Sequence, residues 1–191
     1  MEQKPEIMHL MIIEKCDRKC ELCCNKLYNI EELPIATVEE LRQVHTVCIT
    51  GGEPFKLGAY VDTFAGLIKE QFPNVKNVYV YTSGDALWSS YWLRHWAFFM
   101  WLDGINFAPK NINDWDAIKL ILEHSTDAFR CSIRNMGSNR LYVFKNQVKM
   151  FEEKYSYVAK ELNLNVIYRK WDKQFKTPAN EIFRRLPIFL G

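Results

Sequence analysis

Long hydrophobic runs are absent from this chain of 191 residues. Its two most apolar windows, IMHLMII (7–13) and WAFFMWL (96–102), are far shorter than the ~20 residues that a membrane-spanning helix requires. Charged residues bracket the second window, and we interpret it as the buried end of a helix. We expect no signal peptide either, because the amino-terminal MEQKPE is mixed in charge and the apolar stretch behind it is short. We therefore expect a cytoplasmic protein with no membrane association.

A dominant charge of either sign is also missing, since 25 basic and 23 acidic residues leave a formal net charge of +2. This balance alone neither favours nor excludes a nucleic-acid partner. We interpret the basic residues of the carboxyl-terminal third as a solvated face and do not expect a nucleic-acid partner, but these residues leave open an enzyme that modifies nucleic acid. Internal repeats, low-complexity tracts and linkers are missing too, which favours a single domain over residues 1–191.

Apolar segments alternate with amphipathic segments along most of the chain. The apolar segments predict strands, and the segments with apolar residues at helical spacing predict helices. Such an alternation implies right-handed crossovers and a parallel sheet. The expected fold class is α/β, a partial (β/α)6 TIM-like barrel with functional loops at the carboxyl ends of its strands. We expect strands at 7–13, 46–50, 77–84, 104–109, 128–135 and 165–171, and helices at 58–72, 86–101, 114–124, 148–162 and 179–186, with a further short helix opened by a Thr37–Glu40 capping box.

Four of the six cysteines are concentrated in CDRKCELCCN (16–25), directly after the first expected strand. In a reducing compartment such a cluster indicates metal or redox chemistry before disulfides. Cys16, Cys20 and Cys23 have the spacing C-x3-C-x2-C, and thiolates are the ligands that hold iron–sulfur clusters and zinc. Three ligands leave one metal position open for substrate, although structural zinc sites also use closely spaced cysteines.

The remaining cysteines are interpreted as bystanders. Cys24 is adjacent to Cys23, and neighbouring thiolates point in different directions, so we expect it to be a spectator. Cys48 and Cys131 fall inside expected strands, where cysteine behaves as a small buried hydrophobic residue. The sequence has no second cysteine cluster, so an auxiliary iron–sulfur cluster is not expected.

A second motif, TGGEP (50–54), directly follows the second expected strand. The paired Gly51 and Gly52 allow backbone N–H and C=O groups to approach a ligand that a Cβ atom would exclude. Glu53 adds a carboxylate, and Pro54 makes the turn rigid. Backbone and carboxylate acceptors suit an ammonium group, so we interpret the loop as a site for an amino-acid head group. A tight strand-to-helix turn would explain the glycines, but it would not explain the cysteine loop upstream.

With C-x3-C-x2-C after the first strand and GGEP after the second, the sequence resembles the radical S-adenosylmethionine superfamily over residues 7 to about 110. The resemblance implies that Cys16, Cys20 and Cys23 ligate three irons of a [4Fe-4S] cluster. It also implies that the fourth iron binds the amino and carboxylate groups of S-adenosylmethionine, with the GGEP strand end holding the amine. Members usually carry an aromatic residue against the adenine just before the third cysteine, and Leu22 takes that place here.

Other strand ends supply candidate site residues by position, because such loops line the sites of these barrels. For the cofactor we predict Leu22, Thr50, Gly51, Gly52, Glu53, Pro54, Thr82, Ser83 and Ser132. For the substrate we predict Asp85, Lys110, Arg134 and Arg169. His9 is interpreted as a hydrogen-bonded core histidine, and the aromatic residues between 88 and 107 are interpreted as core packing.

The resemblance leaves three functions open. The first is an enzyme that abstracts hydrogen from a small polar substrate and receives electrons from a flavodoxin or ferredoxin. Its substrate could be purine-like, because 7-carboxy-7-deazaguanine synthases are similar in size and carry a lysine late in the fourth strand, as Lys110 is here. The second is an activase of a glycyl-radical enzyme, whose substrate is the backbone of a partner protein. The third is a non-catalytic module stabilised by zinc.

Overall fold

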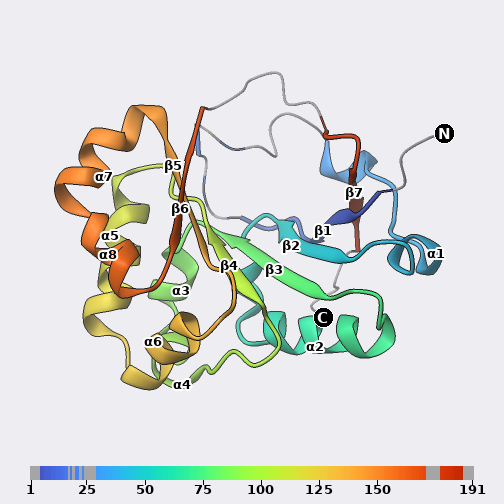
Figure 1. Cartoon of the computed structure of the whole chain (residues 1–191), viewed down its shortest axis with the longest axis horizontal. Coiled ribbons are helices and arrows are strands. Elements are labelled where there is room, and N and C mark those ends of the chain that lie inside the picture. The colour runs from blue at the N-terminus through green and yellow to red at the C-terminus, as the bar shows by residue number, and fades with distance from the viewer. Residues whose placement is uncertain are drawn as a thin grey trace.

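The computed structural model describes residues 5–16, 18, 20, 21, 23, 29–170 and 177–186. The predictions for Leu22 and Cys24 lie outside these residues. Seven parallel strands form one sheet in the order β6-β5-β4-β3-β2-β1-β7, and its two edges are not paired with each other within the described residues (Figure 1). The fold is the expected α/β partial barrel. Its strands are β1 (Ile7–Ile13), β2 (Thr46–Gly51), β3 (Asn77–Thr82), β4 (Gly104–Phe107), β5 (Arg140–Phe144), β6 (Asn165–Arg169) and β7 (Glu181–Arg185).

Each connection between consecutive strands from β1 to β6 contains at least one α-helix, as parallel strands require. In the part of the chain that the structure describes, no helix is both long and apolar enough to span a membrane. The expected capping box is confirmed, because the Thr37 hydroxyl accepts from the Glu40 N–H and the Glu40 carboxylate accepts from the Thr37 N–H. The α-helices are α1 (Val38–Leu41), α2 (Tyr60–Gln71), α3 (Asp85–Ser89), α4 (Tyr91–Trp96), α5 (Ile112–His124), α6 (Asp127–Arg134), α7 (Val148–Lys154) and α8 (Ser156–Glu161). Three 3-10 turns, η2 (Ile30–Glu32), η3 (Pro54–Leu57) and η4 (Lys145–Gln147), complete the described elements.

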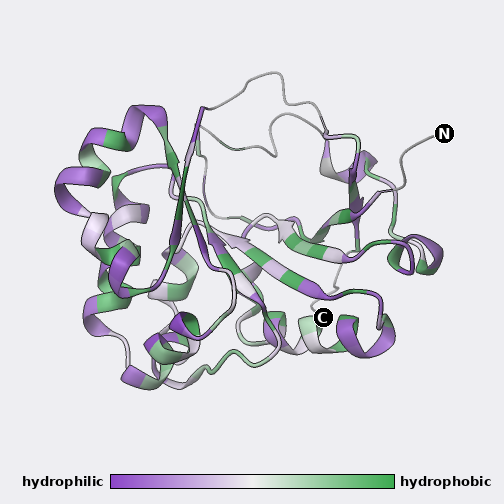
Figure 2. Cartoon of the chain, viewed as in Figure 1, coloured by the Kyte–Doolittle hydropathy of each residue, from purple (hydrophilic) through white to green (hydrophobic). Residues whose placement is uncertain are grey.

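The two faces of the sheet differ in chemistry. Alternate strand residues, such as Ile105 and Phe107 of β4, belong to the hydrophobic core that packs against the helices. Side chains between them point to the opposite side, which we call the inner face. Figure 2 shows hydrophobic and more hydrophilic residues alternating along β2 and β3. The inner face carries polar and aromatic residues outside the core, among them Tyr81, Asn106 and Tyr142.

The expected strand at 128–135 is wrong, because these residues form most of α6. The Thr126 hydroxyl accepts a hydrogen bond from the Phe129 N–H and so caps the helix. Phe129 and Ile133 are buried at helical spacing, which fixes the amphipathic helix against the core. Cys131 is exposed on this helix instead of buried in a strand. The fifth strand is β5, which follows α6.

The expected helix at 179–186 is also wrong, because Glu181–Arg185 form β7. These residues pair in parallel with Ile7–Met11 of β1, and Ile182 packs against the core. The free backbone groups along β1 offer a complete row of hydrogen bonds, which outweighs the weak strand propensity of a charged segment. β7 therefore extends the sheet beyond the six strands that we expected.

Several aromatic residues expected in the core are exposed. The stretch 86–101 forms two short helices and a loop instead of one helix, so WAFFMWL is not a buried helix end. Phe99 and Phe107 are buried. The exposed members are Tyr91, Trp92, Trp96, Phe98 and Trp101, of which Trp101 is the least exposed at 47%. The expected helix 148–162 is likewise divided, into α7 and α8.

One carboxylate holds the loop that follows α4. The buried Asp62 side chain of α2 accepts hydrogen bonds from the N–H groups of Met100, Trp101 and Leu102, each at 3.0 Å. We predict that Asp62→Ala lowers the free energy of unfolding by about 2 kcal/mol, because these donors lose their acceptor. Chemical denaturation measures the change, with Glu39→Ala on exposed α1 as the control. Equal small losses in both variants would contradict the assigned role of Asp62.

Candidate functional site

The cysteine loop and the GGEP turn meet through backbone contacts at the carboxyl edge of the sheet. The Gly52 N–H donates to the Ile13 carbonyl at 2.7 Å, and the Glu53 N–H donates to the Lys15 carbonyl at 3.3 Å. A Cβ atom on Gly51 would lie 2.2 Å from the Ile13 carbonyl oxygen, and one on Gly52 would lie 2.2 Å from that of Lys15. The glycines therefore admit the backbone that leads into the cysteine loop.

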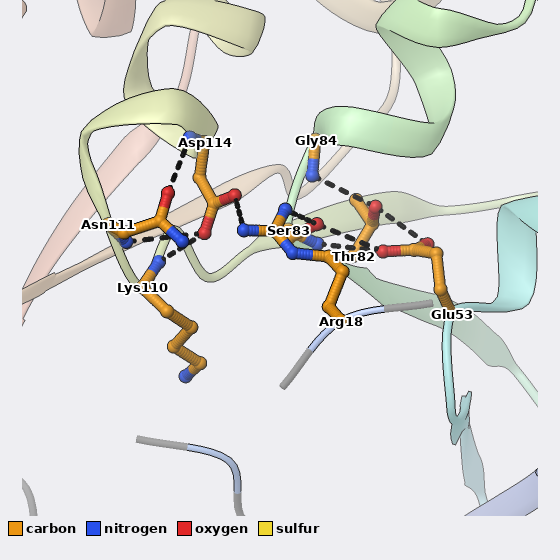
Figure 3. Close-up of polar contacts among 8 residues, drawn as sticks. All are labelled: Arg18, Glu53, Thr82, Ser83, Gly84, Lys110, Asn111 and Asp114. Atoms are coloured by element: carbon orange, nitrogen blue, oxygen red, sulfur yellow. Dashed lines mark hydrogen bonds and ion pairs between the residues drawn. The ribbon is translucent and has the colours of Figure 1, made fainter. Parts of the chain in front are cut away.

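Glu53 joins the ends of β2 and β3. Its side chain is buried, and burial raises the pKa of the carboxyl group, while hydrogen bonds from Ser83, Thr82 and Phe55 act in the opposite direction. One carboxylate oxygen accepts from the Thr82 hydroxyl at 2.9 Å and from the Phe55 N–H at 3.3 Å. The other accepts from both the N–H and the hydroxyl of Ser83 at 3.1 Å. Thr82 and Ser83 thus contact Glu53 directly (Figure 3).

Arg18 extends this network from the cysteine loop to α5. Its guanidinium donates to the Ser83 hydroxyl at 3.0 Å and forms an ion pair with the fully buried Asp114 (Figure 3). The other carboxylate oxygen of Asp114 accepts from the N–H groups of Lys110 and Asn111. Burial is the largest single influence and would lower the pKa of Arg18, but the charge and hydrogen bond of Asp114, together with the nearby Cys20 and Asp85, raise that pKa overall. The loop between Cys16 and Cys20 is therefore anchored across the carboxyl edge.

The three motif thiols lie near enough to one another for Cys20 and Cys23 to influence the pKa of Cys16. Cys16 is exposed, and Cys20 and Cys23 are half-buried. Partial burial raises the pKa of Cys16, and the nearby Glu53, Cys20 and Cys23 raise it further. Within residues 5–16, 18, 20, 21, 23, 29–170 and 177–186, no group of three or more His, Cys, Asp or Glu side chains is gathered closely enough to hold a metal ion. The set has the soft donors and the common loop that a cluster needs, so its chemistry fits one.

A pocket of about 260 Å³ adjoins Cys16. The cysteine loop contributes Arg18 to its wall, the GGEP turn contributes Glu53, and the start of α3 contributes Asp85. The two sequence motifs thus line a single pocket, together with one predicted substrate residue. Pro54 lies at the start of η3, which forms the same wall through Phe55, and Thr50 lies near the end of β2.

The other predicted substrate residues lie in two regions. Lys110 follows β4 at the carboxyl edge, and its ammonium lies 4.3 Å from the centre of the Phe144 ring. Arg169 ends β6, and its guanidinium lies 4.2 Å from the centre of the Tyr142 ring. Ser132 and Arg134 are not brought to this edge, because they lie on α6. The end of α6 contacts the opposite, amino end of β5, where the Asn139 side chain donates to the Ile133 carbonyl. The Ser132 hydroxyl donates to the Phe129 carbonyl, and Arg134 contacts Glu161.

Sequence reasoning missed three residues. Arg18 stands between two motif cysteines, which was a signal for a role in the loop. The sequence pattern places Asp114 only near the start of a helix, yet Asp114 is both the ion-pair partner of Arg18 and part of a capping box with Asn111. Asn106 interrupts the apolar residues of β4, and a polar residue inside a buried strand is itself a signal. His9 is hydrogen-bonded to Glu181, as expected of a paired histidine, but it lies outside the hydrophobic core.

Among the solved structures that match this chain are SuiB and BtrN. SuiB of Streptococcus suis, solved bound to S-adenosylmethionine, has a TM-score of 0.49 and 14% identity, over 88% of this chain and 40% of that one. BtrN, solved in complex with AdoMet and 2-DOIA, has a TM-score of 0.35 and 13% identity, over 88% of this chain and 57% of that one. The chain thus spans less than two thirds of either protein. No family model matches the chain, and no curated protein matches it.

The contact between Gly52 and Lys15 yields a first prediction for the site. We expect Gly52→Ala to lower the free energy of unfolding by about 1–3 kcal/mol, because the added methyl group forces the approach to the cysteine loop away from the turn. Thermal and chemical denaturation measure this loss. Gly137→Ala is the matched control, because a Cβ atom there meets nothing within 4 Å. A loss no larger than that of the control would show that the close contact is unimportant.

The Arg18–Asp114 ion pair yields a second prediction. Arg18→Gln leaves the Asp114 carboxylate buried without its cation, and breaking a pair of this kind costs on the order of 3 kcal/mol. Asp114→Asn in the same chain should recover part of that loss, because it removes the uncompensated charge. Unfolding free energies of the two single variants and the double variant form the thermodynamic cycle. Strictly additive losses would contradict a direct ion pair.

Proposed function

We propose that the protein is a radical S-adenosylmethionine enzyme that abstracts a hydrogen atom from a small polar substrate. The observation that carries the proposal is the convergence of the two motifs on one pocket. Cys16 and Glu53 line that pocket, and two backbone hydrogen bonds join their loops. Separate structural roles would give each motif its own local contacts, whereas one shared pocket is what a common ligand requires.

Cys16, Cys20 and Cys23 would hold a [4Fe-4S] cluster, and the pocket beside Cys16 would receive S-adenosylmethionine. A reduced cluster, when bound, supplies the electron that cleaves the S–C5′ bond of S-adenosylmethionine to methionine and a 5′-deoxyadenosyl radical. A flavodoxin or a ferredoxin is the expected electron donor, which fits a protein of the cytoplasm.

The residues of the chain position and shield this chemistry. Arg18 anchors the cysteine loop at the carboxyl edge through Ser83 and Asp114, which lowers the conformational entropy that the loop must lose when its thiols gather around a cluster. The Glu53 carboxylate accepts hydrogen bonds from η3 and from the end of β3, and these bonds hold the GGEP turn in the wall of the pocket. Asp85 at the start of α3 lies on the same wall and is suited to hydroxyl groups of a bound nucleoside.

The decisive test is anaerobic reconstitution of the full chain with iron and sulfide, followed by dithionite and S-adenosylmethionine. We predict about four irons per chain, a visible charge-transfer spectrum and the formation of 5′-deoxyadenosine. Cys16→Ala, Cys20→Ala and Cys23→Ala should each lose the cluster and the product. Cys131→Ala is the matched control, because this thiol is exposed on α6 and outside the motif. We expect Cys24→Ala to keep the cluster.

Each outcome of this test separates one interpretation from another. Loss of the cluster in Cys24→Ala would overturn the choice of ligands. A cluster that never cleaves S-adenosylmethionine without a partner would favour an activase of a glycyl-radical enzyme. Binding of stoichiometric zinc without iron would overturn the enzyme and leave a structural module.

A further inference from the structure

Asn106 is a buried amide without a hydrogen-bond partner. Its side chain is fully buried, and neither its amide nitrogen nor its amide oxygen has a partner among the residues that the structure describes. The neighbouring Ile105 and Phe107 belong to the hydrophobic core, so Asn106 points to the inner face of the central strand β4. An unpaired donor and acceptor at such a position destabilise the fold, which calls for a ligand that pairs with them.

Two tyrosines cross over β4 beside this amide. Tyr81 of β3 is the register neighbour of Asn106, and its ring lies parallel to that of Tyr142 of β5, with centroids 5.9 Å apart. Their hydroxyl groups are 3.3 Å apart. Because β4 lies between β3 and β5, rings that meet from these strands must pass over it. Asn106 therefore lies beside aromatic surfaces that suit a planar group.

Two arginines add positive charge on the same side. Arg140 is the register neighbour of Asn106 on β5, and its guanidinium lies 5.1 Å from the centre of the Tyr79 ring. Arg169 of β6 lies over the Tyr142 ring. Neither arginine forms an ion pair with any residue in the described parts of the chain. The charge of Arg169 helps to lower the pKa of Glu181, but the carboxylate of Glu181 is already paired with His9.

We infer that the inner face binds a small planar anion with an amide-like edge as the substrate of the proposed enzyme. Asn106 pairs with adjacent donor and acceptor atoms of that edge, as one amide pairs with another. Arg140 and Arg169 neutralise its carboxylate or phosphate group. Tyr81 and Tyr142 move apart to admit the ring and then pack against it. That this ligand is a substrate rests on the proposed function, whereas the existence of the binding site does not.

Binding of simple probes to the full chain tests the site without any cluster. Orotate carries a pyrimidine edge and a carboxylate, and uridine 5′-monophosphate carries a related edge and a phosphate. Uracil supplies the edge without charge, and benzoate supplies the charge without the edge. We expect calorimetric binding of at least one anionic nucleobase probe, at least tenfold tighter than uracil or benzoate. The stronger of the two anionic probes identifies the anionic group.

Variants then assign the binding to these residues. Asn106→Leu has a similar volume and no polar atoms, so the ligand-free protein should become more stable to heat while its affinity for the probe falls at least tenfold. Arg169→Gln should also weaken the anionic probe at least tenfold but leave uracil unchanged. Lys149→Gln on the exposed face of α7 is the control and should change neither. Arg169 is exposed, so its variant reports on binding even if Asn106→Leu folds poorly.

The outcomes separate this inference from the proposed function. Absence of binding by both anionic probes, or binding that Asn106→Leu and Arg169→Gln leave unchanged, would overturn the inferred site. If the reconstituted protein still cleaves S-adenosylmethionine, the proposed function holds and only the inferred substrate class is wrong. Conversely, probe binding that depends on Asn106, in a chain that fails to take up iron on anaerobic reconstitution, would keep the site and overturn the radical enzyme.

Discussion

The close backbone contact between the exit of β1 and the GGEP turn is the constraint on which the rest of the site depends. It requires glycine at 51 and 52, since any side chain would meet the carbonyl groups of Ile13 and Lys15. Once this contact is made, Glu53 lies where it can bind the end of β3, and the cysteine loop begins directly above the sheet. The first three strand ends are thereby joined into one wall.

Arg18 connects the cysteine loop to two further elements, the end of β3 and the helix α5. A loop that supplies three thiols loses conformational entropy when it binds a metal centre, and that cost is smaller if the loop is already held. The ion pair with Asp114 and the hydrogen bond to Ser83 provide such an anchor from within the motif. The anchor is charged and lies partly out of water, so its contribution depends on both partners being present. Arg18 therefore anchors the same loop that carries the spaced cysteines.

The sequence predicted what depends on local pattern and failed where distant segments decide. The bounds of β1 and the capping box of α1 follow from short-range periodicity and side-chain chemistry, and both are confirmed. Residues 128–135 suit a strand or a helix equally by composition, and burial of Phe129 and Ile133 decides for the helix. β7 required knowledge that the edge of β1 was free. The Arg18–Asp114 pair joins the cysteine loop to α5, which no local pattern could reveal.

The position of the polar groups on the inner face supports our proposal of a small-molecule substrate over the activase. An activase must admit a loop of a folded partner, and such a loop first meets the exposed rim of a barrel. Here the distinctive groups lie on central strands, with Asn106 fully buried and Tyr142 almost so. In the binding mode that we infer, a small molecule displaces two side chains to reach them, whereas a protein backbone would need a much wider opening. The depth of Asn106 and Tyr142 therefore supports the proposed small substrate over a partner protein, and Arg140 and Arg169 on the same face support an anionic one.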